Sequence, residues 1–146
     1  MKTLLAAVAL CAPILLASVT AASAGDVTVN VHGLQAKHGT VYVVLDDQDH
    51  FLKPGAAIKT MLADPPAGDH SFVLKDVPPG DYAVVVLHDE NDNRQMDYDS
   101  SGRPTEGWAL TRFAADQMRF PTFDDAKVTV AAGGGSFDVT MNYPGQ

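Results

Sequence analysis

The sequence predicts an all-β fold, a single antiparallel β-sandwich of about seven strands. Three observations support this class. Short apolar or alternating segments recur along residues 27–142, turn-forming Gly, Pro, Asn and Asp residues separate them, and no long amphipathic helical pattern occurs. Because the chain also lacks internal repeats and linker-like segments, we expect one domain over residues 25–146.

The first half of that domain supplies four of the expected segments. Val27–Val31 alternates valine with polar residues, which predicts a strand with one buried face. Gly39–Leu45 is β-branched and apolar on both faces, so it suits a central strand covered on both sides. Asp69–Leu74 is a further expected strand, whereas Ala56–Ala63 fits a short strand and a helical turn equally well.

The second half supplies three more strands. Tyr82–Leu87 carries the strongest strand pattern in the chain, and it follows the proline-rich turn Val77–Asp81. Lys127–Ala131 and Ser136–Asn142 flank a run of glycines, which favours a hairpin. Little periodicity exists in the long segment after Asp89, but we expect it to be ordered because it brings four aromatic side chains that favour burial: Trp108, Phe113, Phe120 and Phe123.

The N-terminus has the order of a secretory signal peptide. A positively charged start at Met1–Thr3 precedes the apolar run Leu4–Val19, and Ala22–Ala24 supplies a small-x-small cleavage site. The run is shorter than the about 20 apolar residues that span a bilayer, and Pro13 interrupts it, so we expect no transmembrane anchor. The sequence therefore predicts a signal peptide over residues 1–24, cleavage after Ala24, and export to the periplasm or the medium.

Export changes both the charge and the thiol content of the protein. Cys11 is the only cysteine, and it leaves with the signal peptide; Leu10 before it disfavours processing as a lipoprotein. Residues 25–146 therefore have no cysteine and can form no disulfide. Loss of Lys2 makes the formal charge more negative than the −8 of the whole chain. Such a surface repels phosphate backbones, so we expect no nucleic-acid partner and consider cations plausible ligands.

One loop has the spacing of a calcium site. Oxygen-bearing side chains occur at its first, third, fifth and ninth positions, and the backbone carbonyl of the seventh is available; these residues are Asp89, Asn91, Asn93, Asp97 and Gln95. Calcium takes six to eight oxygen ligands, and short loops wrap it with this odd-position spacing. The sequence thus predicts that the loop binds Ca²⁺ or a similar hard cation.

Two positions depart from that pattern. Arg94 stands at the sixth position, where such loops turn sharply on glycine, and Ser100 stands at the twelfth, where a bidentate glutamate usually closes the shell. We therefore expect modest affinity unless Asp99 or a neighbouring loop supplies the missing group. The alternative interpretation is a connection rich in Asx turns, because Asp and Asn side chains bond to nearby backbone N–H groups.

The signs of catalysis or of a transition-metal site are weak. The chain has no Gly-x-Ser-x-Gly elbow, no phosphate loop and, after cleavage, no cysteine nucleophile. His88 and Glu106 are conceivable acid/base groups, but the sequence favours a non-catalytic protein. The histidines share no ligand spacing, so surface positions are favoured over a zinc or copper site; they are His32, His38, His50, His70 and His88.

A second binding hypothesis rests on Trp108. Polar groups at Arg103, Glu106 and Arg112 flank this tryptophan, as in platforms that stack on sugar rings. This arrangement suggests a carbohydrate- or envelope-binding module, with a glycan or a cell-envelope protein as partner. A lone tryptophan is more often a core residue or a loop anchor, and that interpretation is favoured.

Several segments together resemble the bacterial exported family known as domain of unknown function 2141: Gly39–Leu45, Val77–Val84, His88–Asn93, Glu106–Trp108 and Pro121–Ala126. The resemblance extends from about Val27 to Tyr143. It implies a β-sandwich of the transthyretin-like or surface-adhesin-repeat kind, and it assigns no catalytic residue. The family's loop usually reads Asp-x-Asn-x-Asn-Gly before a further Asp; Asp89, Asn91, Asn93 and Asp97 match it, and Arg94 replaces the glycine.

Overall fold

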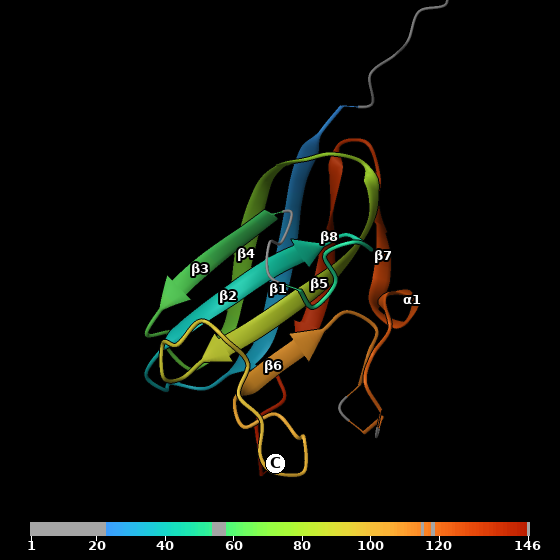
Figure 1. The fold of residues 1–146 in the computed structure, drawn as a ribbon. Helices are drawn as coiled ribbons and strands as arrows, with labels where there is room; N and C mark the ends of the chain where they lie inside the picture. The colour runs from blue at the N-terminus through green and yellow to red at the C-terminus, as the bar shows by residue number, and fades with distance from the viewer. Residues whose placement is uncertain (1–22, 54–57, 115, 118, 146) are drawn as a thin grey trace, which may run out of the picture.

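The computed structural model describes residues 23–53, 58–114, 116–117 and 119–145, and the expected signal peptide lies almost wholly outside this part. The described residues form eight strands in two sheets and one helix of four residues (Figure 1), which confirms the expected all-β class. The strands are β1 (Gly25–Leu34), β2 (Thr40–Asp46), β3 (Ile58–Ala63), β4 (Gly68–Val77), β5 (Gly80–Asp89), β6 (Gly107–Leu110), β7 (Lys127–Val130) and β8 (Gly134–Thr140).

The smaller sheet has three strands in the order β4-β1-β8. β1 pairs with β4 in antiparallel fashion but with β8 in parallel, so the expectation of a wholly antiparallel sandwich is wrong for this one pair. The first and last strands of the domain are thus neighbours, and the central strand of this sheet begins at Gly25. No short turn joins β1 to β8, so chain connectivity does not impose an antiparallel direction on them.

The larger sheet has five strands, with β3, β2 and β5 side by side and both β6 and β7 on the far edge of β5. β6 pairs with residues 85–88 of β5, and β7 pairs with residues 80–83. The ambiguous segment around residues 56–63 is a strand over its described part, because Ile58–Ala63 pairs with β2 along its whole length. β6 lies within the segment that showed little periodicity.

The expected hairpin between the last two strands is wrong. β7 joins the larger sheet and β8 joins the smaller one, and only one bridge, between Ala131 and Gly134, links the two segments. Gly133 and Gly134 have φ angles of +91° and +95°, which lets the chain cross between sheets in a very short turn. A side chain at Gly134 would meet the backbone of Asp26, because a Cβ atom there would lie 2.0 Å from the Asp26 carbonyl oxygen.

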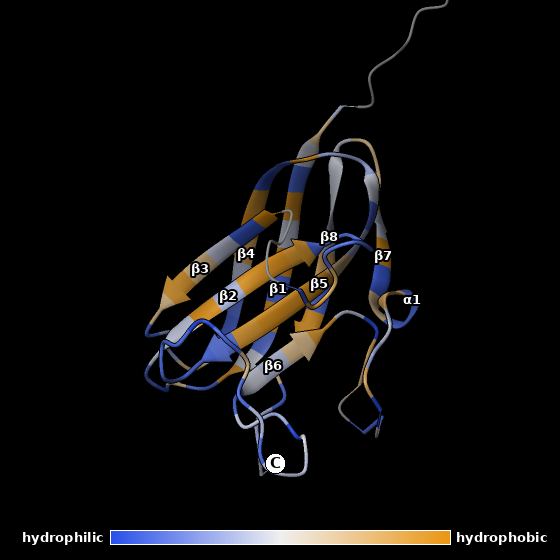
Figure 2. Cartoon of the chain, viewed as in Figure 1, coloured by the Kyte–Doolittle hydropathy of each residue, from blue (hydrophilic) through white to orange (hydrophobic). Residues whose placement is uncertain are grey.

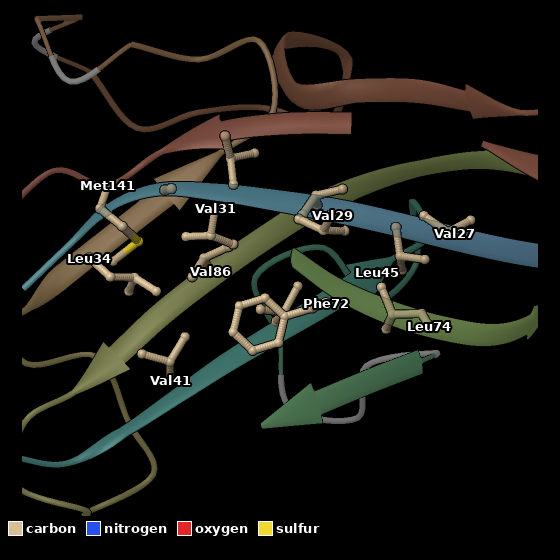
Figure 3. Close-up of a cluster of buried hydrophobic side chains, with 14 of the residues drawn as sticks. Val27, Val29, Val31, Leu34, Val41, Leu45, Phe72, Leu74, Val86 and Met141 are labelled. Carbon is tan, nitrogen blue, oxygen red and sulfur yellow. The ribbon is translucent and has the colours of Figure 1, made fainter. Parts of the chain in front are cut away.

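The core lies between the two sheets and is built from one face of each strand. Figure 2 shows hydrophobic residues concentrated on the strands, and Figure 3 shows how apolar side chains of β1, β2, β4 and β5 meet. The alternating valines of β1 are fully buried, as their period of two predicted. Other buried members include Val41, Val43, Leu45, Phe72, Leu74, Val84, Val86, Val139 and Met141.

A smaller apolar cluster covers the outer face of the larger sheet. Leu110 and Phe113 are buried there with Ala83 and Ala126, and Phe51 packs edge-on against Phe123 at 5.8 Å between ring centroids. The helix α1 (Phe123–Ala126) belongs to this cover; it has four residues, and no described helix is long and apolar enough to cross a membrane. Of the four aromatic side chains expected to favour burial, Phe113 is buried, Trp108 and Phe123 are partly buried, and Phe120 is 70% exposed.

The core predicts a clear contrast between two apolar strand residues. Leu45 is completely buried on the inner face of β2, whereas Met61 on β3 is 61% exposed. We expect Leu45→Ala to lower the free energy of unfolding by about 2–5 kcal/mol, because the truncation leaves a cavity. Met61→Ala should change it by less than about 0.5 kcal/mol. Urea unfolding followed by circular dichroism measures both, and equal losses would contradict the assignment of the core.

One carboxyl group is buried beside the outer cluster. Asp46 ends β2 with only 3% of its surface exposed; Oδ2 accepts the N–H of Leu52 at 3.0 Å, and the buried Oδ1 has no hydrogen-bond partner. Burial, opposed by the Leu52 hydrogen bond and reinforced by the charge of Asp47, raises the pKa of Asp46 to about 6. The folded state therefore holds this proton more tightly than the unfolded chain does.

Stability should consequently fall as the pH rises from about 4 through about 6, because Asp46 then acquires a buried charge in the folded state. We expect Asp46→Asn to raise the free energy of unfolding at pH 7 by on the order of 2–3 kcal/mol and to flatten that part of the pH profile. Asp49→Asn is the control, since Asp49 is an exposed carboxyl in the turn that follows β2. Thermal melts between pH 4 and 8 test the pair, and a stability loss in Asp46→Asn at pH 7 would refute the assignment.

Candidate functional site

The long connection between β5 and β6 folds back on itself. It leaves β5 at Asp89 and re-enters the sheet at Gly107, at the end of the sandwich where the chain also ends (Figure 1). The N–H of Thr105 donates to the carbonyl of Asp97 at 2.9 Å, and Tyr98 forms a bridge with Pro104. The predicted metal loop is the first half of this connection.

Asp89 anchors the start of the loop. It is fully buried, and its carboxylate accepts two backbone N–H groups, from Asn93 to Oδ1 at 3.1 Å and from Arg94 to Oδ2 at 2.6 Å. A carboxylate at the end of a buried strand has little water around it, so these hydrogen bonds satisfy it. Asp89 therefore fixes the turn that follows β5.

The structure brings Asn91, Asn93 and Asp97 together. The side-chain amide groups of Asn91 and Asn93 donate to Oδ2 of Asp97 at 2.6 and 3.0 Å. Their side-chain oxygens accept the backbone N–H groups of Asn93 at 3.0 Å and of Gln95 at 2.8 Å. The third, fifth and ninth positions of the loop thus meet at one carboxylate oxygen, and Gln95 is held by its own backbone N–H.

The sharp turn predicted at the sixth position forms without glycine. Arg94 has a φ angle of +65° and Asp92 one of +58°, both in the left-handed region that costs a non-glycine residue roughly 1–2 kcal/mol. The Asp92 carboxylate points out of the loop, because Oδ1 accepts the Thr40 hydroxyl at 2.8 Å and Oδ2 lies 3.6 Å from His38 Nε2. The positive φ angle of Arg94 is the source of the steric cost expected at the sixth position of the loop.

Glu106 is the residue of this site that the sequence spacing missed. It is 4% exposed and joins both halves of the connection: Oε1 accepts the N–H of Glu90 at 2.9 Å, and Oε2 accepts the N–H of Asp97 at 3.2 Å. Burial raises the pKa of Glu106, the two backbone hydrogen bonds lower it, and the charges of Asp89 and Asp97 raise it further. An acidic residue immediately before a strand was visible in the sequence, but its partners lie 9 and 16 residues away.

The oxygen atoms of the loop are of the kind that binds a hard cation, but their present arrangement does not place them around one. Among residues 23–53, 58–114, 116–117 and 119–145, no three carboxylate, imidazole or thiol groups are placed to hold a metal ion together. Carboxylate, amide and carbonyl oxygens of the loop are nevertheless the ligands calcium prefers. The amides of Asn91 and Asn93 present N–H to Asp97, so cation binding requires them to turn their oxygens inward. The loop as it stands is built of Asx turns.

The histidines are mostly on the surface, as expected. His32 lies between Asp69 (Nδ1 to Oδ2, 2.9 Å) and Asp138 (Nε2 to Oδ1, 3.1 Å), and hydrogen bonds first to Asp69 and then to Asp138 raise the pKa of His32. His88 is the exception, because it is completely buried and its Nδ1 lies 2.8 Å from the Tyr143 hydroxyl. Burial lowers the pKa of His88.

The residues of the alternative hypotheses have separate partners. Trp108 is half-buried with its ring 6.4 Å from that of Phe113, and Arg103 bonds to Asp99 at 3.1 Å. Arg112 donates to the carbonyl of Lys127 at 2.8 Å. It follows the end of β6, whereas Glu106 precedes the start of that strand. Two surface pockets in the described part of the chain, one beside Val139 and one beside Pro104, are lined by neither His88 nor Glu106.

The backbone of the loop predicts the effect of restoring its glycine. We expect Arg94→Gly to raise the free energy of unfolding by about 0.5–1 kcal/mol, because glycine adopts a φ of +65° without strain. Gln95→Gly is the matched control, since Gln95 is outside the left-handed region, and it should lower stability by about 0.4–1 kcal/mol. Chemical denaturation distinguishes them; destabilisation by both glycines would show that the turn carries no strain at Arg94.

Comparison with known proteins identifies the family. No curated protein and no solved structure matches the chain. The profile of a family described as an uncharacterized protein conserved in bacteria, domain of unknown function 2141, matches residues 29–137. This span contains six whole strands, β2 to β7, and the complete β5–β6 connection with Glu106, and it confirms the resemblance drawn from the sequence motifs. The chain therefore belongs to the bacterial family of domain of unknown function 2141.

Proposed function

We propose that this protein is an exported, non-catalytic β-sandwich whose Asp89–Asp97 loop binds calcium. The observation that carries the proposal is the convergence of Asn91, Asn93 and Asp97 on a single carboxylate oxygen, with Asp89 anchoring the same turn. In this loop the side chains of residues 91, 93 and 97 meet because the backbone curls around them. Calcium loops use the same odd positions for their ligands.

The surroundings of the loop favour a cation over an anion. The whole chain has a formal charge of −8, and Glu106 and Asp89 are both buried next to the loop. A bound Ca²⁺ would be held by the carboxylates of Asp89 and Asp97, the side-chain oxygens of Asn91 and Asn93, and the carbonyl of Gln95. It would offset the repulsion between the carboxylates of Asp89 and Asp97, whose charges, after burial, also help to raise the pKa of Glu106.

The affinity follows from the cost of rearrangement. Before binding, Asp97 must give up its two amide hydrogen bonds, and the turn must keep Arg94 in the left-handed region. We therefore place the dissociation constant at about 10⁻⁴–10⁻³ M, the range of extracellular calcium modules. An exported protein meets calcium in this range. Binding would then order the connection between β5 and β6, including its outer half around Tyr98–Pro104.

Calorimetric titration of the purified protein with CaCl₂ tests the proposal. We expect saturable heat and a rise in melting temperature on addition of calcium. Asp97→Asn keeps the shape of the side chain but removes its charge, so it should weaken the calcium affinity at least tenfold and reduce the melting shift. Asp92→Asn is the control in the same loop, because the Asp92 carboxylate faces Thr40 and His38 instead of the turn. Its affinity should stay within about twofold, since it supplies no ligand.

Three results would count against the calcium site. The first is the absence of heat and of any melting shift at millimolar calcium. The second is equal loss of affinity in both variants, which would indicate diffuse attraction to an acidic surface. The third is tighter binding of Mg²⁺, because magnesium demands a smaller octahedral shell that a flexible loop does not provide.

A further inference from the structure

The last strand of the smaller sheet has an open edge. β8 pairs with β1 on one side and with no other strand among the described residues. Unpaired strand edges offer backbone hydrogen bonds to other chains, and proteins usually shorten, charge or cover them. β8 is seven residues long, so its edge is large enough to matter.

The parallel ladder shows which backbone groups face outward. The N–H of Met141 donates to the carbonyl of His32 at 2.9 Å, and His32 is opposite Thr140 in the register. In a parallel pair, alternate residues direct both backbone groups to the same neighbour. The backbone groups of Phe137 and Val139 therefore point to β1, and those of Ser136, Asp138 and Thr140 point away from it. Among the residues that the structure describes, only the Thr140 carbonyl of this set has a hydrogen-bond partner, the side chain of Asn142 at 3.3 Å.

A groove runs along this edge. It has a volume of about 310 Å³. Residues of β8 and the segment after it line the groove together with residues from the end of β6 onward: Asp138, Val139, Thr140 and Asn142, and Leu110, Arg112, Phe113 and Ala114. One end is closed where Trp108 and Asn142 exchange backbone hydrogen bonds at 2.9 and 2.8 Å. From that bridge β8 and the segment after β6 diverge. Asp138 and Thr140, whose outward N–H groups have no partner in the described part of the chain, line the groove.

We propose that this groove binds an extended segment of another polypeptide, which adds a strand to β8. Main-chain ladder bonds would supply affinity, and alternate side chains would contact Leu110, Phe113 and Val139. The charge of the chain decides the kind of partner. A second copy of the chain would bring another formal charge of −8 and a second Asp138 to the same edge. We therefore assign the groove to a segment of a different polypeptide with uncharged or basic residues.

Selection from a random 12-residue phage-displayed peptide library on the immobilised protein tests this inference. Thr140→Pro removes the outward N–H and fills the groove, and it breaks no ladder bond to β1; Thr140→Val keeps the N–H and removes only the hydroxyl. We expect enriched peptides with alternating apolar residues and a net positive charge. Their affinity should fall at least tenfold in Thr140→Pro and stay within about twofold in Thr140→Val, because the ladder uses the backbone.

Amide chemical shifts locate the peptide. Binding should move the NMR signals of Asp138, Thr140 and Phe113 in the unchanged protein. The proposal would be overturned by a selection that enriches nothing, by peptides that bind Thr140→Pro as well as Thr140→Val, or by shifts confined to the 89–97 loop. Self-association of the purified protein that Thr140→Pro abolishes would also overturn it, since the occupant would then be a second copy. None of these results depends on calcium.

Discussion

The structure depends on the burial of one face of every strand between two sheets. Disulfides and ion pairs contribute little by comparison. Cys11 is the only cysteine, so no intramolecular disulfide can form, and ion pairs such as His32–Asp69 and Lys75–Asp26 lie at the surface. Each buried valine or leucine contributes about 1.5–3 kcal/mol. The core therefore sets the position of each strand end, and the loops inherit that position.

The loop after β5 illustrates this dependence. β5 is the central strand of the larger sheet, with β2 on one side and β6 and β7 on the other, so Asp89 leaves from the most constrained element of that sheet. Glu106 stands at the start of β6, which pairs with the same strand. The pairing of β6 with β5 holds the two ends of this long connection together, so Glu106 reaches the backbone N–H groups of Glu90 and Asp97. The rigid sheet supplies the preorganisation, and the loop supplies the oxygens.

The first and last strands of the domain, β1 and β8, are also positioned by the sheet that they share. β1 is central in the smaller sheet, so β4 and β8 both complete their pairing on it, and the outer edge of β8 remains open. His32 on β1 stabilises this arrangement on the outer face by contacting Asp69 of β4 and Asp138 of β8. The candidate calcium loop and the β8 groove are separate features of one framework, since one belongs to a turn and the other to a strand edge.

The sequence by itself determined the fold class, most of the strands and the local contents of the loop. Alternation in β1 and in β8, the apolar runs of β2 and β5, and the turns at Gly and Pro are all local signals. Only tertiary structure decided the parallel pairing of β1 with β8, the separation of β7 from β8, and the strand at Gly107–Leu110, whose partner β5 lies some 20 residues earlier in the chain. It also decided the burial of His88 against Tyr143 and the loop-closing role of Glu106. These depend on contacts between distant residues, which no periodicity within a short window records.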